Sequence, residues 1–203
     1  MNFLFVASLL VPSVAQQEQG NVASSDDARL ESLISSLTSE EGHKEAMAEL
    51  YALIRVPVYS YALSLVKSPQ DAEDILHDTL ISIHDAAASY VPKGKPMAWI
   101  ITIARNHGYG RLRRRKYVAD IPDEEWDNYL SEQEQVTPED RIVLEQCLRA
   151  LSDIERQIVV MHAVAGMKHR VIAATLELPL STVLSKYNRA LKKLRKNLQI
   201  DLP

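Results

Sequence analysis

The residues in this chain best suited to chemistry are two groups of cations that can bind a polyanion. Residues 105–116 hold six basic side chains and no acidic one, and residues 186–196 repeat that pattern. Between them, residues 117–140 hold nine acidic side chains and no basic one. The net charge of −4 hides this pattern, because the chain without those nine acids carries +5. Two separated basic surfaces predict two footprints on one nucleic acid.

The second basic stretch lies on a predicted helix, 180–198, which follows a short apolar helix, 169–176, and a turn at Glu177-Leu178-Pro179. These are the proportions of a helix-turn-helix, whose second helix can enter a major groove. Thr182 and Ser185 could then reach bases or phosphates, and the cations farther along would meet phosphates. The alternative is a solvated amphipathic helix, whose cations favour the C-terminal end of the helix dipole.

The first basic stretch follows a helix that contains Trp99, with Tyr109 and Tyr117 within or beside the cations. Aromatic side chains among arginines suit unstacked bases, because each stacked base contributes about 1–3 kcal/mol. Two plainer interpretations remain open. Trp99 has the helical spacing of a core residue with Ile100 and Ile103, and the arginines 113–115 could form a simple phosphate patch.

The apolar pattern has helical spacing throughout, and with only six glycines it predicts an all-α fold. Helices are expected from Ala28, from about Lys44, from Ser68 and from Met97, with a kink or break at Pro57. Ser68 with Pro69, and Ser152 with Glu155, are helix starts. We expect two helical domains joined by an acidic flexible linker, the C-terminal one a helix-turn-helix. The segments are 1-27, disordered or wrongly included, then 28-117, the linker 118-139, and 140-203.

Several classes of function are excluded by what the sequence lacks. The single cysteine, Cys147, excludes an internal disulfide and a cysteine-based zinc site. The histidines lack metal-ligand spacing, and no phosphate loop or nucleophile motif occurs. We therefore expect that the protein binds no cofactor and is not an enzyme. The apolar run at 3–11 resembles a signal peptide but has no preceding cation and is too short to span a bilayer. We therefore expect a cytoplasmic protein without stable membrane insertion.

Three runs in order carry a family resemblance: DAEDILHDTLISIHDA at 71–86, MAWIITIARNHGYGRLRRRK at 97–116, and LSDIERQIVVMHAVAGMKHRVIAATLELPLSTVLSKYNRALKKLRK at 151–196. Together they resemble a bacterial RNA polymerase sigma factor of the extracytoplasmic-function (ECF) type. The resemblance covers about residues 30–198. It implies a transcription initiation factor that binds core RNA polymerase, through its β′ and β subunits, and promoter DNA, with an anti-sigma factor as a further partner.

The resemblance also implies roles for individual residues. The helix at 71–86 would dock on the β′ subunit through Asp71, Glu73, Asp74, His77 and Asp78. Downstream promoter DNA would meet Lys93, Lys95, Trp99, Arg105, Asn106, Arg111, Arg113, Arg114, Arg115 and Lys116. The upstream element would meet His169, Arg170, Ser181, Thr182, Ser185, Lys186, Arg189 and Lys193. The acidic linker would lie along polymerase channels or serve only as a tether.

Departures from the family pattern limit what the resemblance implies. Glu177 stands where the helix-turn-helix turn usually has glycine, and Gly110 replaces an aspartate often found before the arginines. Lys186 replaces an arginine, which loses bidentate geometry toward a phosphate or base. Two alternatives stay open: a stand-alone helix-turn-helix regulator, and an exported helical protein whose basic patches touch membranes or other polyanions.

Overall fold

The computed structural model describes residues 26–39, 42–115 and 150–197, and within them it contains helices and no strand. The prediction of an all-α fold is confirmed. After a first helix over 26–36 come α3 (His43–Val66), α4 (Pro69–Ala86), the short 3₁₀ helix η1 (Ala87–Ser89), α5 (Pro96–Arg115), α7 (Asp153–Ala163), α8 (His169–Thr175) and α9 (Leu180–Asn197).

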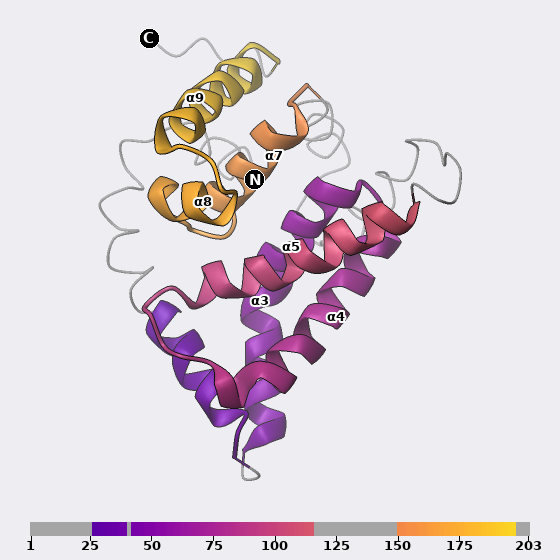
Figure 1. Ribbon diagram of the computed structural model, residues 1–203, viewed down its shortest axis with the longest axis vertical. Helices are drawn as coiled ribbons and strands as arrows, with labels where there is room; N and C mark the ends of the chain where they lie inside the picture. Colours follow the sequence, from indigo (N-terminus) through magenta and orange to yellow (C-terminus); the bar gives the residue numbers. More distant parts are fainter. Residues whose placement is uncertain (1–25, 40–41, 116–149, 198–203) are drawn as a thin grey trace, which may run out of the picture.

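The helices form two groups that pack directly on one another (Figure 1). Helices α3, α4 and α5 contact each other in pairs, and so do α7, α8 and α9. The second group rests on the first, because α7 contacts α3 and α8 contacts α5. One continuous apolar core therefore runs through both groups, and its fully buried members include Leu50, Tyr61, Ile75, Ile100, Ile158, Met161 and Ile172.

The local signals for helix starts hold in the structure. The Ser68 hydroxyl accepts a hydrogen bond from the Asp71 amide at 3.3 Å, with Pro69 opening α4. Ser152 and Glu155 form the complete capping box that opens α7. These starts need only side chains within three residues of each other, which is why the sequence predicts them.

Pro57 does not interrupt the helix that contains it. A break there was one of two expected outcomes and is wrong, since α3 continues from His43 to Val66. Proline removes one backbone hydrogen bond and crowds the preceding turn. In α3, however, Pro57 and most residues after it are buried, so the packing of this half of the helix offsets the loss.

Three predicted features concern residues outside the described ones: the segment before residue 26, the whole acidic linker at 118–139, and Cys147. Within the described residues, no helix combines the length and the apolar character needed to cross a bilayer.

The capping box makes a prediction about stability. Replacing Ser152 with alanine removes the acceptor of the Glu155 amide and a donor to its carboxylate, so Ser152→Ala should destabilise the protein by about 1–2 kcal/mol. Urea unfolding followed by circular dichroism measures the loss. The matched control is Ser32→Ala, at an exposed position of the first helix, which should stay within about 0.5 kcal/mol of the parent protein. Equal effects of the two changes would contradict the assignment.

Candidate nucleic-acid interface

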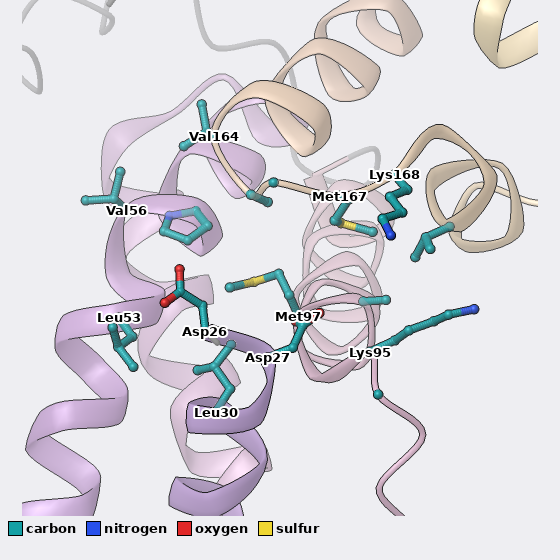
Figure 2. Close-up of a pocket in the computed structure, with 16 residues that line it drawn as sticks. Asp26, Asp27, Leu30, Leu53, Val56, Lys95, Met97, Val164, Met167 and Lys168 are labelled. Atoms are coloured by element: carbon teal, nitrogen blue, oxygen red, sulfur yellow. The ribbon is translucent and has the colours of Figure 1, made fainter. Parts of the chain in front are cut away.

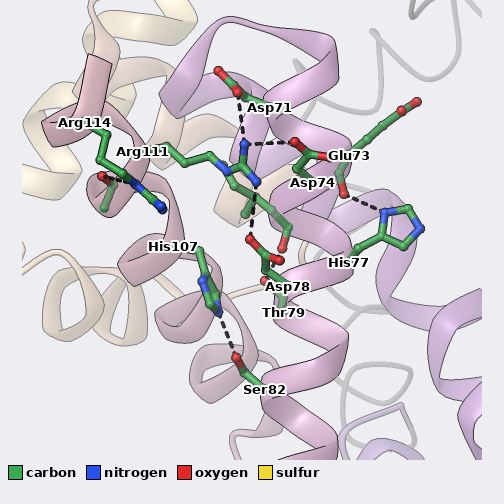
Figure 3. Close-up of polar contacts among 12 residues, drawn as sticks. Asp71, Glu73, Asp74, His77, Asp78, Thr79, Ser82, His107, Arg111 and Arg114 are labelled. Atoms are coloured by element: carbon green, nitrogen blue, oxygen red, sulfur yellow. Dashed lines mark hydrogen bonds and ion pairs between the residues drawn. The ribbon is translucent and has the colours of Figure 1, made fainter. Parts of the chain in front are cut away.

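The acidic face of α4 is held by one arginine from α5. Arg111 donates from Nη1 to Asp71 at 3.2 Å and to Asp74 at 2.9 Å, and from Nη2 to Asp78 at 3.4 Å (Figure 3). The three carboxylates stand at helical spacing on one face of α4. Arg111, which the sequence placed among the DNA contacts, is thus engaged within the protein.

The electrostatics of this cluster leave a net negative surface. Burial alone would lower the pKa of Arg111, but the hydrogen bonds and charges of Asp78, Asp74 and Asp71 outweigh burial and raise it. The guanidinium is therefore fully charged, and three carboxylates against one cation leave two negative charges. Glu73 and His77 remain exposed, and His77 Nδ1 donates only to the Glu73 carbonyl of its own helix, at 2.9 Å. The five predicted polymerase contacts thus lie along one acidic stretch of α4, in which Glu73, Asp74 and His77 are exposed and the two other carboxylates are half-buried.

The loop before α5 is braced by the first helix. Glu31 accepts hydrogen bonds from the Gly94 amide at 2.8 Å and the Tyr90 hydroxyl at 3.4 Å. Burial, followed by the charge of Glu31, raises the pKa of Tyr90 to about 12, so that its hydroxyl keeps its proton and donates. Trp99 packs half-buried against the Tyr90 ring, with centroids 4.6 Å apart. Trp99 therefore belongs partly to the core and keeps one part accessible, while Lys93 and Lys95 are exposed on the loop.

The basic end of α5 offers fewer free cations than its sequence suggests. Arg105 lies over the Tyr109 ring, 5.2 Å from its centroid, and pairs with Glu177 of the second group. Asn106, Arg113 and Arg114 are exposed, and Arg114 donates weakly to the Gly110 carbonyl at 3.4 Å. The side chains of Arg115 and Lys116 lie outside the described residues.

The helix-turn-helix consists of α8, a turn at 176–179 and α9. The Leu178 amide donates to the Ala173 carbonyl at 2.9 Å, which closes the end of α8. Val183 and Ala190 are buried along α9, and the opposite face presents most of the predicted DNA contacts. Of the predicted upstream contacts, Arg170 on α8 is exposed. On α9, Ser181, Ser185 and Arg189 are exposed, and Thr182 and Lys186 are half-buried.

His169 sits inside this unit rather than on its outer face. Its ring lies 4.1 Å from that of His162 and 4.6 Å from that of Tyr187, measured between centroids. Burial, together with His162, lowers the pKa of His169 to about 4, which leaves the ring neutral near neutral pH. The contacts are those of a packing residue at the junction of α7, α8 and α9.

Lys193, another predicted DNA contact, pairs with the carboxylate of the α7 capping box. Its ammonium lies 2.6 Å from Glu155 Oε2, and the Glu155 side chain is only 2% exposed. Burial alone would raise the pKa of Glu155, but the bonds from Lys193 and Ser152 outweigh it and lower the pKa. The pair fixes α9 against α7 and so sets the angle at which the helix-turn-helix presents its outer face.

Sequence reasoning missed three residues that shape these surfaces. They are Glu31, Tyr187 through its ring, and Arg111 through its ion pairs with the α4 carboxylates. All three act through partners far away in sequence, and no local pattern marks them. A surplus of acids at one spacing on α4 is the single signal that could have pointed to an arginine partner.

Among the described residues, no cluster of histidine, cysteine, aspartate and glutamate side chains could hold a metal ion.

Comparisons with known families agree with this division into two parts. The model of sigma-70 region 2 matches residues 50–117, and the model of sigma-70 region 4 matches residues 141–194. The two matches follow one another in order and together cover more than half of the chain. The first contains the α4 acids and the α5 cations, and the second contains the helix-turn-helix.

Curated relatives and solved structures point the same way. The ECF RNA polymerase sigma factor SigK of Mycobacterium sp. (strain KMS) is 26% identical over 160 residues, covering 74% of this chain and 82% of that protein. SigK of Mycolicibacterium vanbaalenii is 24% identical over 182 residues, covering 85% of this chain and 91% of that protein.

The fold resembles that of the sigma factor RpoE in complex with the anti-sigma factor NepR from Bartonella quintana (TM-score 0.58, 24% identity, covering 76% of this chain and 98% of that chain). It also resembles CnrH in complex with the cytosolic domain of CnrY (TM-score 0.58, 22% identity, 86% and 99% covered). The chain therefore belongs to the sigma-70 family of RNA polymerase sigma factors, and within it to the ECF type.

The Glu155–Lys193 pair predicts a pH-dependent effect on stability. Lys193→Met should destabilise the protein by about 1–3 kcal/mol near pH 7, because a buried carboxylate loses its counter-charge. A carboxyl with a lowered pKa stabilises the fold above its unfolded value of 4.5, and this contribution disappears as the pH falls through the lower folded value. The gap between parent and variant should therefore shrink as the pH is lowered below about 4.5.

Denaturant titrations at a series of pH values measure that gap. The control is Lys192→Met, the exposed neighbour on the same helix, which should show no such pH dependence. A gap that stays constant into acid would contradict the pairing.

Proposed function

We propose that this protein binds core RNA polymerase, recognises a bipartite promoter and helps to melt its downstream part. The observation that carries the proposal is the ordered pair of family matches, region 2 over 50–117 and region 4 over 141–194. Each match contains a surface whose charge suits one of these tasks. A stand-alone helix-turn-helix regulator finds no support, because it would leave the region 2 match without a role.

The polymerase contact would be the acidic stretch of α4. Its carboxylates are pre-positioned by Arg111, and two negative charges remain uncompensated on that face. Such a surface complements a basic helical surface on a partner subunit, for which the family resemblance gives β′. Glu73 and His77 extend this stretch with groups that have no partner from another helix among the described residues.

Promoter melting would rest on binding the opened strand more tightly than the duplex. The half-buried ring of Trp99 beside the 90–95 loop offers a stacking surface, and Arg113 and Arg114 offer exposed cations for the phosphates. No bond is made or broken in such a step, and we propose that the protein is not an enzyme.

Upstream recognition would use the exposed N-terminal part of α9. Ser181, Thr182 and Ser185 stand where the second helix of a helix-turn-helix meets base edges, with Arg189 beyond them for the backbone. We propose that the protein works in the cytoplasm, with polymerase and promoter DNA. An anti-sigma factor is a further proposed partner, since RpoE was solved in complex with the anti-sigma factor NepR, and CnrH in complex with the cytosolic domain of CnrY.

The proposal is tested by adding the purified protein to core polymerase and a library of promoters from its source. Promoter-dependent initiation is expected. Glu73→Lys should weaken polymerase binding at least about tenfold, because a cation then faces a basic partner surface. Glu45→Lys, an equal charge reversal at an exposed position of α3, is the control. Binding that is insensitive to Glu73→Lys would argue against α4 as the docking surface, and absence of any polymerase binding would refute the proposal.

The arginines after Trp99 predict a change in the salt dependence of DNA binding. Each cation that contacts a phosphate adds nearly one unit to the slope of log affinity against log salt. Arg113→Gln with Arg114→Gln should reduce that slope by about one to two units. Arg55→Gln, at an exposed position of α3, should leave it unchanged. The measurement is fluorescence anisotropy of labelled promoter DNA over a salt series, and an unaltered slope in the double variant would mean that these arginines do not touch phosphate.

A further inference from the structure

The two parts of the protein hide portions of their surfaces from each other. Helix α7 lies between α3 on one side and α9 on the other (Figure 1). Every residue from 155 to 161 is buried. The Tyr61 hydroxyl donates to Gln157 Oε1 at 3.4 Å in the interior of this contact. At its edge Lys67 pairs with Asp153 at 3.2 Å. The described arrangement is therefore a closed one, in which the helix-turn-helix rests on the region 2 helices.

The contact is not completely filled. A cavity of about 380 Å³ lies where the first helix, α3, the start of α5 and the turn between α7 and α8 meet (Figure 2). Its walls come from both parts and include Val56, Met97, Val164, Met167 and Lys168. Unfilled space deprives the lining atoms of dispersion contacts, so this side of the contact holds the two parts together less firmly than the α3–α7 side.

On the α5 side, the contact between the two parts brings an acidic side chain onto an arginine that is predicted to bind DNA. Glu177, in the turn of the helix-turn-helix, lies 3.3 Å from the Arg105 guanidinium. The Arg105 side chain is only 19% exposed, whereas that of Glu177 is 77% exposed. Arg105 is a predicted contact of downstream promoter DNA, and a carboxylate engages the same guanidinium donors that a phosphate would use.

The backbone at Glu177 makes this pairing unusual. Its φ is +57°, in the left-handed region that side chains with a Cβ adopt rarely. Turns of this motif often contain glycine, which adopts such a conformation without a steric penalty. The chain thus keeps a charged residue at a position where its backbone conformation is unfavourable, and the carboxylate of that residue meets Arg105.

We propose that Glu177 acts as an intramolecular substitute for a DNA phosphate: it holds the helix-turn-helix turn on Arg105 in the free protein, and promoter DNA must displace it. This inference rests on the proposed function, because it assumes that Arg105 faces DNA. It gives the free protein a lower affinity for DNA than its exposed cations alone would provide. Contact of Arg105 with DNA then requires the turn to move away from α5.

The test is a double-mutant cycle on the free, full-length protein with a labelled DNA duplex of arbitrary sequence. Glu177→Gln keeps the turn and removes the charge, so it should raise DNA affinity about two- to fivefold, the range of a partly exposed ion pair. Glu45→Gln removes the same charge at an exposed position of α3 and measures the general effect of lower negative charge. In the parent protein, Glu177→Gln should raise DNA affinity more than Glu45→Gln does. In the Arg105→Gln background, the two substitutions should raise DNA affinity equally.

A gain that is independent of Arg105, or no larger than that of Glu45→Gln, would overturn the proposal. Glu177→Gly separates charge from backbone conformation. It should bind DNA as Glu177→Gln does and melt at a higher temperature, because glycine relieves the unfavourable φ. A DNA affinity that rises with Glu177→Gly but not with Glu177→Gln would assign the effect to the backbone and also overturn the proposal. The assay contains no polymerase, so its outcome is distinct from the test of promoter-dependent initiation.

Discussion

A helical segment that is buried on all sides requires neighbours on all sides, and residues 155–161 of α7 form such a segment. It supplies the core of the helix-turn-helix through its contact with α9, and it also covers the C-terminal half of α3. Two of its buried polar side chains find partners on opposite neighbours, Glu155 on Lys193 of α9 and Gln157 on Tyr61 of α3. The predicted DNA-contacting residues of the second part are therefore positioned relative to the first part largely through α7, with a smaller contribution from the contact of α8 with α5.

What the sequence predicts correctly is local. Ser68, Ser152 and the glycine after α7 act on backbone groups within a few residues, so their neighbours in sequence are enough to interpret them. The contacts that the sequence does not predict join residues that lie far apart along the chain. Arg111 is separated from Asp74 by 37 residues, and Tyr61 from Gln157 by 96. The break at Pro57 is wrong for the same reason, because the packing that stabilises α3 on both sides of it comes from other helices.

The basic stretches show how charge counts in a sequence differ from charge on a surface. Arg111 and Lys193 are both held by carboxylates of their own part, and Arg105 is held by one from the other part. Each counts as a cation in the sequence, yet each is paired with a carboxylate and is not free to bind a polyanion. Within the described part of the two basic stretches, the exposed cations are Arg113, Arg114, Arg189, Lys192 and Lys196, and their charge is available at the surface. Internal ion pairs thus reduce the strong basic pattern of the sequence to a smaller set of accessible groups.

Glu31 has a consequence for where the first functional part begins. The region 2 match starts at residue 50, yet the loop before α5 depends on a carboxylate 19 positions earlier for its hydrogen bonds at Gly94 and Tyr90. Tyr90 in turn supports one face of Trp99. A family boundary drawn from sequence similarity thus cuts across a physical unit, whose smallest intact form includes the helix at 26–36. A segment outside the family match thus helps to orient a surface that lies inside it.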